Sequence, residues 1–305
     1  MNDNPYYVPG IPEDETKDHI VIAEGLGGLV KCIAINTTET IRNICDIHKT
    51  SSSASCALGR FVTGSLLISE SMKRPTDKQT TILRGSGPLG GITCVTEYGY
   101  KVRAYPLEND IPTEYYRPGK VNVSAAVGEG TLTVIRDIGL KEPYVGSTEL
   151  ISGEIAEDFT YYLAKSEQTP SIVSLGVLIE KGEVTHSGGL MIQLLPGAGE
   201  KEISYLEARA KEFPEISFLQ QEGFTPAKIL DLFMGDPDLK YLSGSPVSFE
   251  CTCSKYRMSE GLIALGRKEL EELVKDGEGI DTQCHFCNKS YHFTPEDIEE
   301  LIGSC

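Results

Sequence analysis

Two pairs of closely spaced cysteines near the end of the chain restrict its fold more than any other feature. Cys251 and Cys253 are separated by one residue, and Cys284 and Cys287 are separated by two. In an extended segment, side chains i and i+2 lie on one face, so both sulfurs of the first pair could reach one ion. The second spacing suits a tight turn. Together the four thiolates would complete a tetrahedral zinc site with Zn–S distances of about 2.3 Å.

The same spacing leaves other chemistry open. Each close pair could also form a disulfide, which would make the site both a structural clamp and an oxidation sensor. His285 and His292 could replace a cysteine as ligand, although four sulfurs already fill the coordination shell. Because a filled shell has no open position for a water or a substrate, the spacing disfavours catalytic zinc. The simplest alternative is a zinc staple for a module with a thin core.

Charge limits the partners of the cysteine region. The chain has 305 residues with 40% hydrophobic content, which suffices for a substantial core and, by length, for two domains. Its 28 basic and 45 acidic residues give a formal charge of −17, and the stretch 247–305 has six Lys or Arg against twelve Asp or Glu. Since nucleic-acid binding needs a basic surface, this charge argues against a zinc ribbon that reads DNA or RNA.

The start of the chain, MNDNPYYVPGIPEDE, has neither the basic segment nor the apolar segment of a secretory signal. Nowhere do about 18 uncharged apolar residues follow one another, as a membrane helix would need. We therefore expect a soluble, cytoplasmic protein without membrane contact. In a reducing compartment, its nine cysteines are expected to be thiols or metal ligands.

Residues 1–199 predict an α+β core domain. Two segments, Ser52–Lys73 and Gly153–Ser166, carry apolar residues at helical spacing. Short runs bounded by Gly, Pro and Asn and rich in β-branched residues indicate strands. These runs are Leu29–Asn36, Thr80–Arg84, Ile92–Thr96, Lys101–Tyr105, Thr131–Asp137, Ile172–Ile179 and Leu190–Leu195.

Residues 200–245 predict a helical linker. One helix is expected around Lys201–Glu212, and a second is expected to begin at Pro226 with Thr225 as its N-cap. The apolar side chains of both lie on one stripe, and the other positions are highly charged. Because such helices are marginal on their own, they need another surface to cover.

Residues 246–305 predict a small C-terminal zinc-binding domain, reached through the Gly-Ser-Pro stretch at Ser243–Pro246. The 30 residues between the cysteine pairs exceed the spacing of ordinary zinc ribbons. The apolar pattern of Ser259–Asp276 predicts a helical segment, interrupted near Gly266, that accounts for the extra residues.

No motif in the chain indicates an enzyme active site. The stretch Gly85–Gly90 matches the dinucleotide-binding pattern G-x-G-x-x-G, but a strand instead of the required helix is expected after it, so we interpret it as a connection between strands. Walker A, G-x-S-x-G and H-E-x-x-H patterns do not occur. The remaining cysteines are isolated, and burial as small apolar side chains is the default expectation for each: Cys32, Cys45, Cys56, Cys94 and Cys305.

An ordered series of motifs, extending over nearly the whole chain, resembles the 33 kDa chaperonin family, the redox-regulated holdase chaperones of bacteria. A short cysteine motif alone would be a weak signal, but the order of these segments makes the resemblance specific. The segments are Gly130–Asp137, Gly139–Tyr144, Gly153–Asp158, Ser166–Gln168, Leu175–Leu178, Ser187–Leu190, Gln193–Gly197 and the two cysteine pairs.

The resemblance implies a reduced, inactive form in which Cys251, Cys253, Cys284 and Cys287 hold one zinc ion. It implies that oxidation pairs Cys251 with Cys253 and Cys284 with Cys287, releases the zinc and activates the chaperone. It further implies a three-part fold of α+β domain, helical linker and zinc domain. Unfolded proteins would be the clients, the active form would be a homodimer, and neither ATP nor a catalysed reaction would be involved.

Other classes of function stay open. A zinc-ribbon protein could bind a nucleic acid or a protein partner, although its acidic charge counts against nucleic acid. A thiol-disulfide oxidoreductase could use Cys284-His-Phe-Cys287, but that motif normally begins a helix in a thioredoxin-like βαβ unit. A purely structural zinc protein is the third possibility.

Overall fold

The structure of the protein, a computed structural model, describes residues 10–275, 277 and 279–304. These residues form two compact units that divide between Phe249 and Glu250. Both units combine helices with antiparallel strands, so the predicted α+β class is confirmed. Cys305 lies outside the described residues. Within the described ranges, no helix has the length and apolar character that crossing a bilayer requires.

Most of the helices and strands that the sequence predicts for residues 1–245 are present in the first unit. Helix α5 (Glu200–Glu212) begins one residue before the predicted Lys201, and α7 (Pro226–Met234) begins directly after Thr225, as predicted. Several elements had no predicted counterpart, among them β1 (His19–Gly25), α1 (Thr38–His48), β9 (Tyr144–Glu149), α6 (Ile216–Gln221) and β12 (Lys240–Pro246). In chain order the elements are β1 (His19–Gly25), η1 (Leu26–Gly28), β2 (Val30–Asn36), α1 (Thr38–His48), α2 (Ser52–Ile68), η2 (Ser69–Ser71), β3 (Lys78–Gly85), β4 (Gly91–Glu97), β5 (Lys101–Pro106), β6 (Tyr115–Arg117), β7 (Lys120–Val121), α3 (Val123–Val127), β8 (Gly130–Asp137), β9 (Tyr144–Glu149), α4 (Ala156–Lys165), β10 (Ser171–Glu180), β11 (Glu183–Leu194), α5 (Glu200–Glu212), α6 (Ile216–Gln221), α7 (Pro226–Met234), β12 (Lys240–Pro246) and β13 (Ser248–Phe249).

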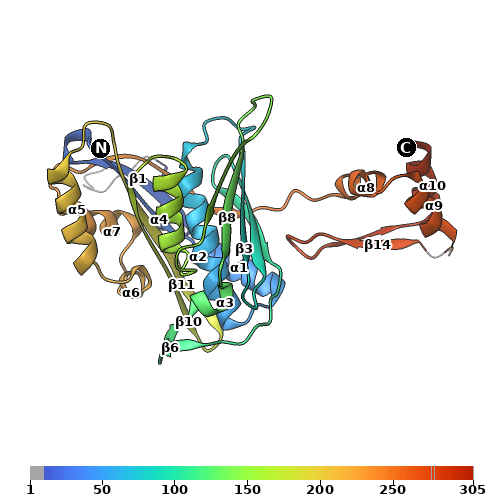
Figure 1. Ribbon diagram of the computed structural model, residues 1–305, viewed down its shortest axis with the longest axis horizontal. Helices are drawn as coiled ribbons and strands as arrows, with labels where there is room; N and C mark the ends of the chain where they lie inside the picture. The colour runs from blue at the N-terminus through green and yellow to red at the C-terminus, as the bar shows by residue number, and fades with distance from the viewer. Residues whose placement is uncertain (1–9, 276, 278, 305) are drawn as a thin grey trace. The chain divides into compact units, whose positions relative to one another are not determined.

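Two sheets form the framework of the first unit (Figure 1). The five-stranded sheet has the order β10-β11-β2-β1-β12, and the six-stranded sheet has the order β13-β5-β4-β3-β8-β9. The stretch Ser243–Pro246, predicted to be a connector, lies within β12 and pairs with β1. The reason is that β1 is buried and its main-chain groups need partners on both sides.

The motif Gly85–Gly90 connects two strands, as interpreted from the sequence. Strand β3 ends at Gly85, and β4 begins at Gly91 opposite Arg84. A dinucleotide site would need a helix at this point, and the chain returns as a strand instead.

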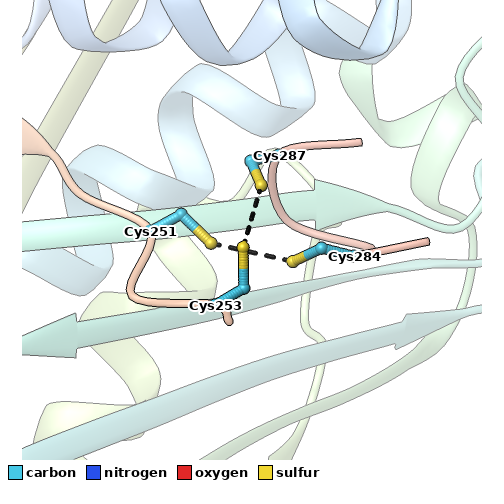
Figure 2. Close-up of side chains that lie close together, drawn as sticks. All are labelled: Cys251, Cys253, Cys284 and Cys287. Carbon is cyan, nitrogen blue, oxygen red and sulfur yellow. Dashed lines mark hydrogen bonds between the residues drawn. The ribbon is translucent and has the colours of Figure 1, made fainter. Parts of the chain in front are cut away.

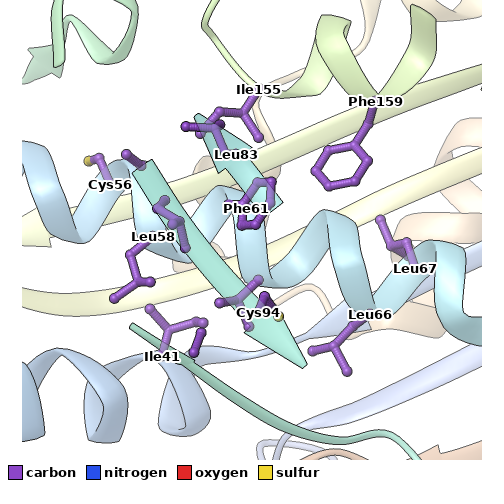
Figure 3. Close-up of a cluster of buried hydrophobic side chains, with 14 of the residues drawn as sticks. Ile41, Cys56, Leu58, Phe61, Leu66, Leu67, Leu83, Cys94, Ile155 and Phe159 are labelled. Atoms are coloured by element: carbon purple, nitrogen blue, oxygen red, sulfur yellow. The ribbon is translucent and has the colours of Figure 1, made fainter. Parts of the chain in front are cut away.

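Helix α2 packs between the two sheets and forms the centre of the larger core (Figure 3). Fifteen of its 17 residues are buried, and small or apolar side chains accordingly occupy every side of the helix. Phe61 lies against Phe159 of α4, with ring centroids 5.7 Å apart. A Cβ added to Gly64 would lie 2.3 Å from the Phe159 ring. The close approach of α4 to α2 therefore requires glycine at this position.

The isolated cysteines of the first unit are buried, as predicted: Cys32, Cys45, Cys56 and Cys94. Burial raises the pKa of Cys32, Cys56 and Cys94 to about 12. These thiols stay protonated at neutral pH, and a protonated thiol is a poor nucleophile. Reactive thiol chemistry therefore does not belong to these three residues.

The other face of the five-stranded sheet is covered by α5, α6 and α7, which we call the linker helices (Figure 1). The sheet contributes an apolar surface, the covered face, made of Val21, Ala23, Val30, Cys32, Ala34, Leu190 and Ile192. The linker helices place Leu206, Ile216, Leu219, Ile229, Leu230, Phe233 and Met234 against it. Since alternate residues of β1, β2 and β11 also belong to the larger core, these strands are apolar on both sides.

Helix α6 rests on a pair of glycines that are direct neighbours in the sheet, Gly176 of β10 and Gly188 of β11. A Cβ on Gly176 would lie 2.6 Å from the main-chain nitrogen of Ser217, and one on Gly188 would lie 2.5 Å from Gln220 Nε2. This amide donates hydrogen bonds to the Ser187 carbonyl at 3.0 Å and to Asn36 Oδ1 at 3.2 Å. The glycines thus let α6 come close enough for polar contacts to fix its position.

Helices α5 and α7 are also tied to each other. Tyr205 and Arg209 of α5 donate hydrogen bonds to the last carbonyls of α7, those of Leu232, Phe233 and Met234. Carbonyls at the end of a helix have no partner within it, and a cation suits their partial negative charge. The linker helices therefore hold one another as well as the sheet.

The second unit has a small core. Its elements are α8 (Lys255–Ile263), α9 (Arg267–Lys275), β14 (Ile280–Gln283), β15 (Ser290–Phe293) and α10 (Pro295–Ser304). The predicted break in the helical stretch is confirmed at Gly266, whose φ is 90°, while Asp276 lies outside the described residues. Among the described residues, the buried apolar cluster is Leu262, Leu270, Phe293 and Ile298. A core of this size rarely supplies more than about 3–5 kcal/mol, so such a unit needs a cross-link.

We expect acid to destabilise the first unit through His19. Its Nδ1 donates to the Lys17 carbonyl at 2.7 Å, and its buried Nε2 has no partner among the described residues. Burial lowers the pKa of His19 below the ordinary 6.5. The stability that depends on the neutral ring is therefore complete above pH 6.5 and is lost as the pH falls through the lowered pKa. Urea midpoints at pH 7.5 and pH 5.5 should fall less for His19→Gln than for the parent chain. An equal fall in both would contradict this role.

Candidate metal centre

The structure brings the four predicted ligands of the second unit together (Figure 2). Cys251 and Cys253 lie in the extended segment before α8, and Cys284 and Cys287 lie in the turn between β14 and β15. Their Sγ atoms all lie within 4.8 Å of one another. Residues more than 30 positions apart in the sequence thus converge on one point.

Local structure fixes both pairs. In the hairpin turn, the Asn288 amide donates to the Cys284 carbonyl at 2.9 Å, and the Cys284 amide donates to the Lys289 carbonyl at 3.0 Å. These two hydrogen bonds close a tight turn that contains Cys284 and Cys287. On the other side, Ser254 is the N-cap of α8, and its Oγ accepts from the Arg257 amide at 3.2 Å. The first cysteine pair is therefore followed directly by a fixed helix start.

The sulfur distances fit a four-coordinate metal ion. Cys251 Sγ lies 3.7 Å from Cys284 Sγ, and Cys253 Sγ lies 3.4 Å from Cys287 Sγ. Four sulfurs at about 2.3 Å from a tetrahedral zinc ion would be about 3.8 Å apart. A disulfide would instead need about 2.05 Å. The donor set could therefore hold a metal ion, and these four cysteines are not joined by disulfides.

Hydrogen bonds make one of the sulfurs easier to ionise. Partial burial opposes ionisation of Cys253, but hydrogen bonds from Tyr291 and Cys287 outweigh it and lower the pKa of Cys253 to about 7. Burial raises the pKa of Cys251 and, together with the bond to Cys253, that of Cys287. The hydrogen bond that the Tyr291 hydroxyl donates to Cys253 Sγ raises the pKa of Tyr291 to about 12. Tyr291 and Cys287 therefore favour the thiolate form of Cys253 before a cation binds.

Tyr291 is the contact residue that sequence reasoning missed. Its hydroxyl lies 3.1 Å from Cys253 Sγ, and its main-chain carbonyl accepts from Thr282 Oγ1 at 3.3 Å across the hairpin. It follows Cys287 by four residues and lies on β15, the strand that leaves the turn carrying Cys284 and Cys287. A hydrogen-bond donor to a ligand sulfur is a usual part of a metal site, because it orients the ligand.

The alternative ligands do not join the cluster. His292 Nδ1 lies 2.9 Å from Asp281 Oδ1 on the neighbouring strand, in an exposed position. Among the described residues, the group with metal-binding geometry consists of the four cysteines and does not include His285. Because four sulfurs complete a tetrahedral shell, the geometry favours a structural site over a catalytic one.

Comparison with known proteins places the chain in one family, with matches over most of its length. The family model described as Hsp33 protein matches residues 18–294. A 33 kDa chaperonin from Ruminiclostridium cellulolyticum is 42% identical over 93% of this chain and 98% of its own length. One from Shouchella clausii is 43% identical over 94% of this chain and 97% of its own length.

A solved structure agrees with the sequence relatives. The crystal structure of the 33 kDa chaperonin (heat shock protein 33 homolog) from Thermotoga maritima superposes with a TM-score of 0.86 at 30% identity. The match covers 94% of this chain and 98% of the other. With its four-cysteine cluster and its helix-covered sheet, the chain belongs to the Hsp33 protein family.

Proposed function

We propose that the chain is an ATP-independent holdase chaperone, without a catalysed reaction of its own, in which oxidation of the four-cysteine centre uncovers a surface for unfolded proteins. The observation that carries this proposal is the presence, in one chain, of a four-thiol cluster and of an apolar sheet face under short helices. Family membership supports the chaperone class, because the curated relatives are named 33 kDa chaperonin.

In the reduced form, Cys251, Cys253, Cys284 and Cys287 would hold one Zn²⁺ as thiolates. Bound zinc would supply a cross-link that can contribute about 10 kcal/mol or more to the folding of a small unit. The second unit depends on such a cross-link, since its buried cluster has four apolar residues among those described. Reduced protein is therefore expected to be folded in both units and inactive.

Oxidation would join Cys251 to Cys253 and Cys284 to Cys287. Each pair of thiols loses two electrons and two protons to form one disulfide, and hydrogen peroxide takes them up to become two water molecules. All four sulfurs are then bonded to carbon and sulfur, so none remains as a thiolate ligand. A disulfide across one intervening residue closes a very small ring, so it is expected to be strained and readily reduced, which makes the switch reversible.

The client surface would be the covered face. Its residues are apolar side chains of β1, β2 and β11, buried under helices of 13, 6 and 9 residues. Helices this short are not stable alone in water, so they stay folded only while they are docked. If unfolding of the second unit loosens the linker, a contiguous apolar surface becomes available to unfolded polypeptides.

The first test follows zinc and activity together. Reduced protein should contain about one zinc ion per chain and should not suppress the aggregation of an unfolding client. Peroxide with mild heat should release the zinc, remove four free thiols and turn suppression on. Zinc is counted with a colorimetric chelator, thiols by alkylation and mass spectrometry, and aggregation by light scattering. Full suppression with the metal retained would contradict the switch.

The second test removes one ligand. Cys251→Ser should lower zinc retention and make the linker region more sensitive to protease in the reduced state, because three thiolates leave the tetrahedral shell incomplete. Cys45→Ser, which changes a buried cysteine outside the cluster, is the matched control and should keep its zinc. Metal content after dialysis against a chelator measures the difference. Equal retention in both variants would show that the site is assigned incorrectly.

The third test opens the covered face without touching the cysteines. Phe233 is 1% exposed and packs edge-on against Phe213, with centroids 4.9 Å apart. Phe233→Ala should weaken docking of α7 by about 3–5 kcal/mol and give aggregation suppression in reduced, zinc-loaded protein. Leu232 is 37% exposed on the same helix, so Leu232→Ala should stay inactive until it is oxidised. If Phe233→Ala is also inactive when reduced, the covered face is not the client surface.

A further inference from the structure

A large groove of the first unit runs along β10, an edge strand of the five-stranded sheet. Its volume is about 1120 Å³, and six consecutive residues of the strand, 174–179, line it. Tyr115 and Tyr116 of the β6–β7 hairpin form one wall, and Glu215 and Ser217 at the start of α6 form another. Small-ligand sites are typically about 300–1,000 Å³. The groove therefore has room for a longer, extended molecule.

The edge of β10 directs main-chain groups into this groove. The Pro170 carbonyl accepts from the Leu194 amide at 3.1 Å, so the even-numbered residues of β10 exchange hydrogen bonds with β11. The odd-numbered residues Leu175, Val177 and Ile179 consequently point their N–H and C=O groups the other way. In the part of the chain that the structure describes, no strand pairs with that side of β10.

The two edges of the sheet are protected unequally. The opposite edge strand, β12, contains Lys240 and Pro246, and the chain at Gly10 and Ile11 packs against Gly244. Lysine, proline and covering segments are common means of preventing strand addition. Residues 171–179 of β10 contain no charged residue and no proline. An uncharged, apolar edge with open main-chain groups is the kind of surface that accepts an added strand.

The groove adjoins the linker helices. Lys120 of β7 forms an ion pair with Glu215, the residue before α6, with Nζ 3.1 Å from Oε1. The two side chains are 40% and 63% exposed, so solvent screens the pair and it holds α6 weakly. Departure of α6 would remove one wall and make the edge of β10 continuous with the covered face.

We propose that the free edge of β10 binds an extended, apolar segment of an unfolded polypeptide as a sixth strand of the sheet. This inference rests on the proposed chaperone function and adds the conformation of the bound client, a β-strand, and the place where its main chain is recognised. Main-chain hydrogen bonds do not depend on side-chain identity, which suits a surface for many sequences. Side chains of the added strand would alternate between the two faces of the sheet.

Val177 provides a matched pair of variants. Val177→Ala shortens the side chain and keeps the edge N–H, whereas Val177→Pro shortens it and removes the N–H. Proline is tolerated on an edge strand where its nitrogen faces outward, so both variants are expected to fold, which circular dichroism checks. The probe is a fluorescent, uncharged peptide of about eight residues with alternating valine and threonine. Anisotropy titrations use the full chain, both reduced and oxidised.

Val177→Pro should bind the probe about tenfold more weakly than Val177→Ala, the effect of a lost hydrogen bond and a displaced strand. A probe with N-methyl groups on alternate amides should also bind the unchanged protein about tenfold more weakly, and this arm does not depend on the folding of any variant.

Equal binding by the two variants, or equal binding of the two probes, would overturn the proposal. So would a change in sedimentation of Val177→Pro with probe binding unchanged, because the edge would then pair with a second copy of the chain. Failure of the redox switch is seen separately, as aggregation suppression that does not respond to oxidation.

Discussion

Burial of the two apolar sides of β1, β2 and β11 is the interaction on which the rest of the structure depends. Burial of an aliphatic side chain contributes about 1.5–3 kcal/mol to the stability of the fold, so exposing either side of this sheet to water would be costly. One side is covered by α2, which is itself enclosed by a second sheet. The other is covered by three short helices that touch the sheet on one side only. The two covers therefore differ in how easily they are lost.

The four-cysteine cluster and the apolar covered face lie in different units of the chain. Three cysteines of the first unit have pKa values raised to about 12 by burial, which makes them poor nucleophiles. In the second unit, Cys253 is favoured as a thiolate by Tyr291, and the cluster lies in a unit with a thin core. The cysteine with the lowered pKa thus lies in the unit with the thin core, and the apolar residues of the covered face belong to the other unit.

The sequence predicted those parts of the site whose signal is local. The spacing of Cys251, Cys253, Cys284 and Cys287 indicated convergence, and Thr225 with Pro226 marked the start of α7. Strand β12 could not be read from its Gly, Ser and Pro residues, because its partner β1 lies over 200 residues earlier. The position of α6 depends on Gly176 and Gly188 being neighbours on two paired strands. The spacing of residues along the sequence does not show this pairing. Tyr291 was missed because a lone tyrosine on a strand carries no metal signal.

The closed edge at β12 has a consequence for assembly. Filaments grow by head-to-tail contacts, in which one edge of a sheet pairs with the other edge of the next copy. Here Pro246, which lacks an N–H, and the segment at Gly10 and Ile11 occupy the second edge, so that contact is blocked. Copies of this chain that pair with one another through β10 can therefore only close into a symmetric pair. The unequal protection of the two edges thereby prevents a filament built by edge-to-edge pairing of this chain's own sheets.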